Sequence, residues 1–190
     1  MSTRREATRR PRQAPSPLHA LSAAEKAAVL DDLLTGHPEL REAAEALASR
    51  RLGDVDRTAT AEQVAWALQT LPHERIGEHS GYQRGIGYVE PSEAAWQLLE
   101  EELEPFTDDL ERRAKVGMKA AARELGLGIL LGLYECEGYD KPETVLSWAE
   151  DFPGEEASVV FDQLRKLDID LPDEFVAELL PRWVHLLRER

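Results

Sequence analysis

The stretch MKAAARELGLGILLGLYEC, from Met118 to Cys136, decides the fold of this chain. Its second half, Leu125 to Tyr134, consists of apolar residues and glycines without a single charge. It is too short to cross a bilayer, which needs about 20 apolar residues. A segment that is apolar on most sides is typical of a buried core helix, and we expect the remaining helices to pack around it.

Three glycines interrupt this helix, at Gly126, Gly128 and Gly132. Each costs a helix roughly 1 kcal/mol relative to alanine. Gly128 and Gly132 are four residues apart and therefore share one face of the helix. The G-x-x-x-G spacing signals membrane dimerisation only inside a longer apolar segment. Here it predicts that the backbone of a neighbouring helix approaches closely within a water-soluble core.

Composition and charge exclude several classes of protein. The 190 residues suit one domain, and 42% are hydrophobic and 32% charged. Residues 1–20 hold five arginines and one glutamate, so the net charge of −14 places −18 on the remainder. Such an acidic body repels phosphate, which disfavours nucleic-acid binding by the folded part. The single cysteine, Cys136, excludes an internal disulfide and a multi-cysteine zinc site.

Residues 1–18 form an arginine- and proline-rich tail that we expect to be disordered, ahead of one domain at 19–190. The tail fits an electrostatic arm for an anionic partner, a solubilising segment or a misassigned start. Its arginines precede no apolar segment, so it does not resemble a secretory signal. Without a membrane span, we expect a cytoplasmic protein.

Helix signals follow one another through the rest of the chain. A capping box, Ser22 with Glu25, opens the first helix, and Pro38 opens a second that runs to about Leu52. The apolar faces expected on these two helices are Ala27, Leu30, Leu33 and Leu34, then Leu40, Ala43, Ala44 and Leu47. The four tryptophans, Trp66, Trp96, Trp148 and Trp183, lie on or beside apolar stripes and favour core positions.

No strand alternation longer than about four residues occurs. The chain is predicted to be all-α: an antiparallel helical bundle of about eight or nine helices. The pairs 21–52 and 155–188 have the length of helical-repeat hairpins. Pro105 predicts either a kink or a boundary inside the long helix that begins at Pro91.

Residues 77–91, GEHSGYQRGIGYVEP, form the only glycine-rich, aromatic-bearing loop predicted in the chain. Such loops often carry function, although a plain crossover connection has the same composition. The candidate binding residues are Tyr82, Arg84, Tyr88 and, on the following helix, Trp96. We expect Tyr82 and Arg84 to be exposed and Tyr88 to be structural, because it adjoins the helix start.

Signals for chemistry are weak, and we predict no catalytic residue, no metal ligand and no cofactor. His73 and His79 flank a possible ligand cluster, but they are six residues apart and fit no zinc motif. Cys136 lies between two glutamates. Their negative charges raise the pKa of the thiol, whereas a nucleophilic cysteine needs a lowered pKa. The carboxylates between Glu100 and Glu111 are predicted to form a solvated helix face.

The run GYVEPSEAAWQLLEEELEPFTDDLERRAKVGMKAAARELGLGILLGLYEC, from Gly87 to Cys136, resembles the helical region of uncharacterised bacterial proteins. Some of those proteins also carry a SWIM-type zinc finger. The shared pattern is a G-Y-V entry, a long amphipathic helix, a glycine break and an alanine-rich helix. The resemblance implies a helical module; the zinc motif needs several cysteines, which this chain lacks.

These observations favour a non-enzymatic, acidic helical module that mediates protein–protein interaction. Two alternatives are a metal-dependent hydrolase that uses the His73–His79 segment and a regulator that contacts nucleic acid through its basic tail. A protein partner is expected, a membrane partner is not, and a homo-oligomer is left open.

Overall fold

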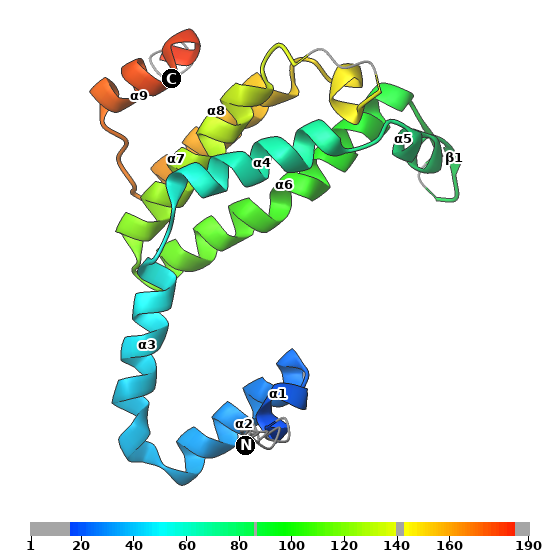
Figure 1. Ribbon diagram of the computed structural model, residues 1–190. Helices are drawn as coiled ribbons and strands as arrows, with labels where there is room; N and C mark the ends of the chain where they lie inside the picture. The colour runs from blue at the N-terminus through cyan, green and yellow to red at the C-terminus, as the bar shows by residue number, and fades with distance from the viewer. Residues whose placement is uncertain (1–15, 86, 140–142, 185–190) are drawn as a thin grey trace, which may run out of the picture. The chain divides into compact units, whose positions relative to one another are not determined.

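The structure is a computed structural model that describes residues 16–85, 87–139 and 143–184. It confirms the all-α prediction: this part of the chain forms nine α-helices, three short 3-10 helices and one two-stranded sheet (Figure 1). In chain order the elements are α1 (Pro17–Ala20), α2 (Ala23–Gly36), η1 (Pro38–Leu40), α3 (Arg41–Gly53), α4 (Arg57–Thr70), α5 (Glu74–His79), β1 (Gly81–Gln83), β2 (Gly87–Val89), α6 (Pro91–Lys115), α7 (Lys119–Cys136), η2 (Val145–Trp148), α8 (Phe152–Lys166), α9 (Asp173–Leu179) and η3 (Pro181–Trp183).

The chain divides into two compact units, residues 1–48 and residues 49–190, with the boundary inside α3. We refer to them as the N-terminal unit and the body. The predicted division into a tail at 1–18 and one domain at 19–190 stays a prediction, because most of that tail lies outside the described residues. The first described helix, α1, begins within its last two residues.

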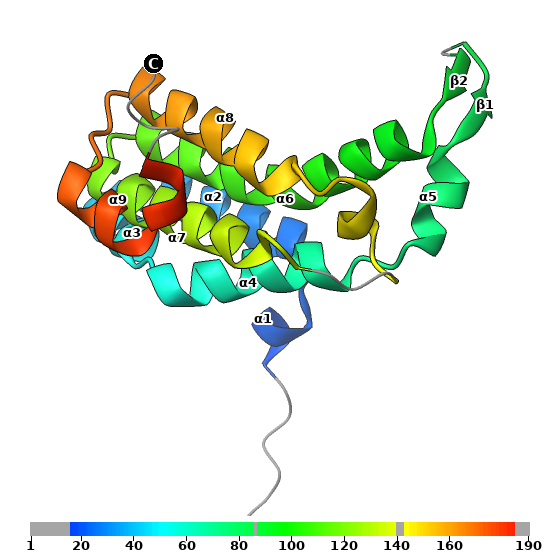
Figure 2. The same ribbon diagram turned by 90° about the horizontal axis from the view of Figure 1, so that it is seen from above.

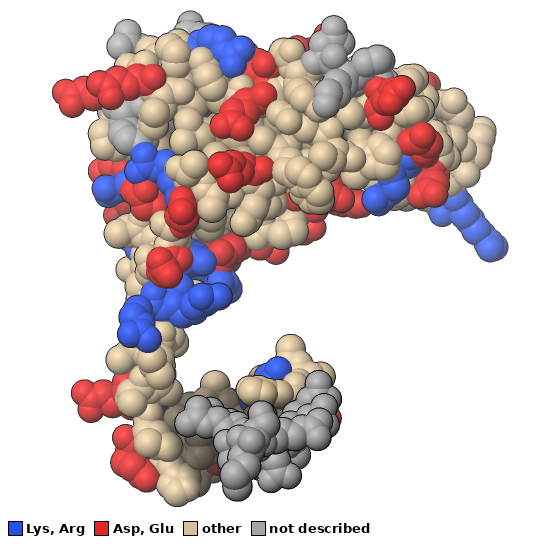
Figure 3. Space-filling model, in the orientation of Figure 1, with Lys and Arg blue, Asp and Glu red and all other residues tan. Residues whose placement is uncertain are grey.

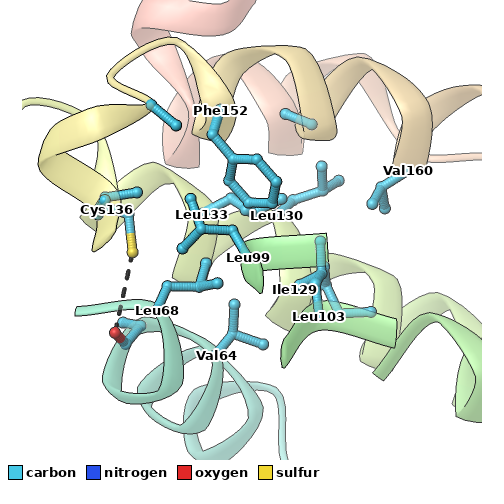
Figure 4. Packing of buried hydrophobic residues seen from close by; sticks show 14 of the residues in the cluster. Val64, Leu68, Leu99, Leu103, Ile129, Leu130, Leu133, Cys136, Phe152 and Val160 are labelled. Atoms are coloured by element: carbon cyan, nitrogen blue, oxygen red, sulfur yellow. Dashed lines mark hydrogen bonds between the residues drawn. The ribbon is translucent and has the colours of Figure 1, made fainter. Parts of the chain in front are cut away.

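Helix α7 lies at the centre of the body and contacts α4, α6 and α8 (Figure 2). Its glycine-bearing half is buried, as the apolar run predicts. Figure 4 shows the packing around it, where Leu68 of α4, Leu99 of α6 and Phe152 at the start of α8 close on Leu130 and Leu133.

The α7 glycines confirm the predicted close approach of a neighbouring backbone, which belongs to α4. A Cβ added at Gly132 would lie 2.6 Å from Val64 Cβ and 2.7 Å from the carbonyl oxygen of Ala61. One added at Gly128 would lie 2.6 Å from Thr60 Cβ. These distances are too short for any side chain, so the absence of a Cβ is what lets the two helices touch.

Prolines act differently in α6 and near the C-terminus. Helix α6 continues through Pro105, so this residue does not mark a boundary between two helices. Pro105 is exposed, where the missing N–H leaves the freed carbonyl within reach of water. Pro181 does separate two elements, since α9 ends at Leu179 and η3 starts at the proline.

Helices α2 and α3 form as predicted, whereas α1 was not predicted, and none of the described residues of the N-terminal unit is buried. The capping box is complete: the Ser22 N–H donates to Glu25 Oε2 at 2.8 Å, and the Glu25 N–H donates to Ser22 Oγ at 3.3 Å. No residue from 16 to 48 is buried, and Leu33 is 44% exposed. The apolar faces predicted for α2 and α3 are therefore not enclosed within this unit.

The four tryptophans differ in how deeply they are buried. Trp183 is buried and stacks edge-on against Tyr134, with ring centroids 5.1 Å apart. Trp96 is half-buried, whereas Trp66 and Trp148 are 70% and 50% exposed, so the core prediction fails for those two.

Candidate functional site

The glycine-rich segment that was predicted to be a loop contains an antiparallel β-hairpin, which projects from one end of the body (Figure 2). Its two strands pair Gly81 with Val89, Tyr82 with Tyr88 and Gln83 with Gly87. Three residues per strand leave no alternation long enough to detect in the sequence. Glycine is also depleted in strands, so local composition favours a loop.

Glycines are needed at the turn of this hairpin because of its backbone conformation. Gly85 and Gly87 have φ values of +91° and +109°, in a region that residues with a Cβ rarely adopt. The glycine content therefore serves a fixed turn. The prediction of a glycine-rich loop did not anticipate this.

The two faces of the hairpin differ, because successive strand residues point to opposite sides. On one face Val89 is 1% exposed and joins the hydrophobic core. On the same face the Gln83 side-chain amide donates to the His79 carbonyl at 2.5 Å. These contacts anchor the hairpin to α5 and to the hydrophobic core.

Tyr82 and Tyr88 occupy the other face and form a cross-strand pair. Their ring centroids are 5.9 Å apart with an interplanar angle of 67°, an edge-to-face arrangement. Tyr82 is 90% exposed, as expected, and Tyr88, which was expected to be structural, is 56% exposed. Arg84 follows at the turn and is exposed, as expected.

Trp96 belongs to a different surface from the tyrosines. It lines a shallow groove of about 440 Å³ on the first turns of α6, together with Ser92, Glu93, Gln97 and Glu100. Its indole N–H donates to Glu100 at 3.2 Å, and its ring packs edge-on against Phe152 at 5.1 Å. The structure thus brings together three of the four predicted binding residues, Tyr82, Arg84 and Tyr88, on the hairpin and assigns Trp96 to the adjoining helix.

The histidines of the His73–His79 segment each contact a backbone carbonyl. His73 Nδ1 lies 3.2 Å from the Glu143 oxygen, and His79 Nδ1 lies 3.0 Å from the Arg75 oxygen. Across the described residues, no three His, Cys, Asp or Glu side chains are placed to share a metal ion. The metal-dependent alternative stays a prediction.

Cys136 is a buried residue of the core. Its thiol lies 4.0 Å from the Ala65 carbonyl, the contact drawn in Figure 4. Burial raises the pKa of Cys136 to about 12, and the nearby Glu135 charge acts in the same direction. The sequence predicted a raised thiol pKa from the neighbouring carboxylates, but burial is the larger cause.

A groove between α6 and α8, of about 720 Å³, was not predicted. Glu156 of α8 lines this groove opposite four of the carboxylates that were expected on a solvated helix face. These four are Glu100, Glu101, Glu104 and Glu111. Burial, followed by the like charges of Glu100 and Glu155, raises the pKa of Glu156 to about 7. The acidic residues of α6 can be recognised in the sequence. That they face Glu156 of α8 depends on the tertiary fold and cannot be predicted from the sequence.

The chain matches no family model, no curated protein and no solved structure. The resemblance of residues 87–136 to the helical region of SWIM-associated bacterial proteins therefore stays a prediction. Within the described residues, no helix is both long enough and apolar enough to cross a membrane.

Proposed function

We propose that this chain is a non-enzymatic helical module that binds another protein through its hairpin. The contact residues are Tyr82, Arg84 and Tyr88, which we call the tyrosine surface. One observation carries the proposal: Tyr82 is 90% exposed and yet is held edge-on against Tyr88. Tyrosine and arginine are among the residues that dominate the energetics of protein interfaces.

The contacts that attach the hairpin to the rest of the body do not come from the tyrosine rings. That role belongs to Val89 and Gln83 on the opposite face. Two aromatic rings that are already positioned lose less conformational entropy on binding than two mobile ones. The exposed pair is therefore suited to contact a partner at low cost.

A protein suits this surface better than a nucleic acid does. Residues 49–190 hold 16 basic and 30 acidic side chains, a net charge of −14, and acidic groups are spread over the face seen in Figure 3. This charge repels phosphate backbones, so the single Arg84 has little effect on nucleic-acid affinity.

The test uses the partner that the immobilised protein captures from a native cell extract. Tyr82→Ala, Arg84→Ala and Tyr88→Ala are each expected to weaken capture by about 1–2 kcal/mol. The free energy of unfolding should barely change, because these side chains are exposed. Trp66→Ala is the matched control, since it removes an aromatic side chain that is 70% exposed on α4, and it should leave capture intact.

Two results would overturn the proposal. Capture that survives all three hairpin substitutions would show that the tyrosine surface is not the contact. A loss of about 3–5 kcal/mol in unfolding free energy for either tyrosine variant, as for a buried aromatic residue, would show that the rings are structural.

A further inference from the structure

The two grooves described above, the one beside Trp96 and the one between α6 and α8, are parts of a single groove. Both are lined by Gln97 and Glu100, so the first leads directly into the second. Together they follow α6 from Ser92 to Glu111, and α8 lies alongside as the second wall (Figure 2). At 1.5 Å per helical residue this is a length of about 28 Å. We call the whole the α6 groove.

The lining of the α6 groove is both apolar and acidic. Trp96, Leu103 and Val159 contribute apolar surface, and Val159 of α8 is 55% exposed. Six glutamates also line the groove, against a single lysine, Lys166. The six are Glu93, Glu100, Glu101, Glu104, Glu111 and Glu156. Long cationic side chains match such a surface, because their methylene stems pack on apolar groups while their charged ends reach the carboxylates.

The chain itself neutralises little of this acidic charge. Glu111 is paired with Lys115 at 2.6 Å. Within the described residues, no basic side chain pairs with Glu101, Glu104 or Glu156. Burial, followed by like charges, raises the pKa of Glu156 to about 7, as expected for a carboxylate without a cation beside it. The groove therefore holds negative charge that a cationic ligand would neutralise.

The charge of the whole chain indicates where such a ligand comes from. Residues 49–190 carry −14, and residues 1–48, with seven basic and seven acidic side chains, carry no net charge. The chain as a whole therefore does not compensate its acidic body. A second copy has the same negative charge and is repelled, as is a phosphate backbone. A basic segment of a different protein has the complementary charge, and arginine in particular pairs with carboxylates through two hydrogen bonds and stacks on aromatic rings.

We propose that the α6 groove binds an arginine-rich segment of another protein, in an extended conformation of about eight residues. Its guanidinium groups pair with Glu101, Glu104 and Glu156, and its side-chain stems cover Trp96 and Val159. This is a second interaction surface, because no residue of the tyrosine surface lines the α6 groove. A failure of either proposal therefore leaves the other intact.

Fluorescence anisotropy of a labelled nona-arginine peptide, titrated with the full-length protein at pH 8, tests this proposal. Val159→Lys places a positive charge in the groove and should weaken binding by at least about tenfold. Val116→Lys is the matched control, because it adds the same charge at a valine that is 57% exposed and lies outside the groove. Its affinity should stay within about twofold of the wild type, because exposed charges at a distance are screened by salt.

A second pair of variants removes negative charge instead of adding positive charge. Glu101→Gln/Glu104→Gln should also weaken binding by at least about tenfold. Glu62→Gln/Glu135→Gln removes the same charge from two exposed positions outside the groove and should stay within about twofold of the wild type. Circular dichroism checks that all four variants keep their helix content. Equal weakening within each matched pair would show that the peptide responds only to net charge, and it would overturn the proposal.

The chain's own arginines are tested in the same assay. A full-length variant replaces the five basic residues of the N-terminal tail by glutamine; they are Arg4, Arg5, Arg9, Arg10 and Arg12. An affinity within about twofold of the wild type would support a groove that is open to another protein. Binding that becomes tighter by about tenfold would mean that the tail competes for the groove, and it would overturn the assignment of the groove to a partner.

Discussion

Helices α2 and α3 of the N-terminal unit and helices α4, α6 and α7 of the body carry apolar stripes of similar spacing. Leu33 on α2 is 44% exposed, whereas Leu133 on α7 has no exposed surface. The spacing of apolar residues shows which face of a helix is apolar, but it does not show which other element packs against that face. In the body, the apolar face of α7 meets α4, because Gly128 and Gly132 have no side chain to keep the two backbones apart.

The largest expected effect comes from the same substitution made in both regions. Leu133→Ala should lower the free energy of unfolding of the body by about 3 kcal/mol, because it removes a fully enclosed side chain. Leu33→Ala should change it by no more than about 0.5 kcal/mol. Urea denaturation followed by tryptophan fluorescence is the appropriate measurement. All four tryptophans lie between residues 66 and 183, so the signal reports on the body alone.

An equal loss of unfolding free energy in Leu133→Ala and Leu33→Ala would contradict the distinction between the two regions. It would mean that the stripe of α2 is part of the same cooperative core as α7. The alternative result, a loss confined to Leu133→Ala, would show that the stripe of α2 is not part of that core.

A matched pair of glycine substitutions tests why α7 packs so closely. Gly132→Ala should destabilise the body by about 2 kcal/mol, because its Cβ meets Val64 at 2.6 Å. Gly154→Ala in α8 has nothing within 4 Å of its Cβ and should stabilise the body by about 0.5 kcal/mol through helix propensity. Thermal or urea unfolding measures both. Stabilisation by Gly132→Ala would show that α4 can move away without cost.

The sequence predicted those parts of the fold that depend on local signals. The charge-free run around Gly128 identified the central helix, and the paired glycines predicted its closest contact. The hairpin at 81–89 was missed because three-residue strands carry no periodicity and its glycines resemble those of a loop. The exposure of Leu33 and the groove beside Glu156 were missed for a different reason. Both depend on which helices pack against each other, and the local sequence of one helix does not identify its neighbours.

The groove between α6 and α8 brings like charges together on the body, and the pH dependence of stability should reveal this. The folded-state pKa of Glu156, about 7, lies above the ordinary glutamate value of 4.5, so the charged carboxylate destabilises the folded state. This destabilisation is fully present above pH 7 and disappears as the pH falls from about 7 to about 4.5. Glu156→Gln should therefore stabilise the body by about 1 kcal/mol at pH 8, a value reduced for solvent screening because the side chain is only half-buried.

Urea denaturation of the wild type and Glu156→Gln at a series of pH values measures this difference. The two curves should converge as the pH approaches 4.5. Glu62→Gln, at an exposed position on α4, is the control and should show no such convergence. A constant difference between wild type and Glu156→Gln across this range would show that the pKa of Glu156 is not raised in the folded state.

The smallest expected effect compares two helix starts that have side-chain caps, one in each region. Asp56 caps α4 of the body by accepting from the Ala59 N–H at 3.1 Å, and Ser22 caps α2 of the N-terminal unit. Because α4 is packed into the core, Asp56→Ala should lower the free energy of unfolding of the body by about 1 kcal/mol. Ser22→Ala should leave the tryptophan transition unchanged and reduce only the helix content seen by circular dichroism. A loss of body stability in Ser22→Ala would show instead that α2 unfolds together with the core, and the two regions would then have to be treated as one.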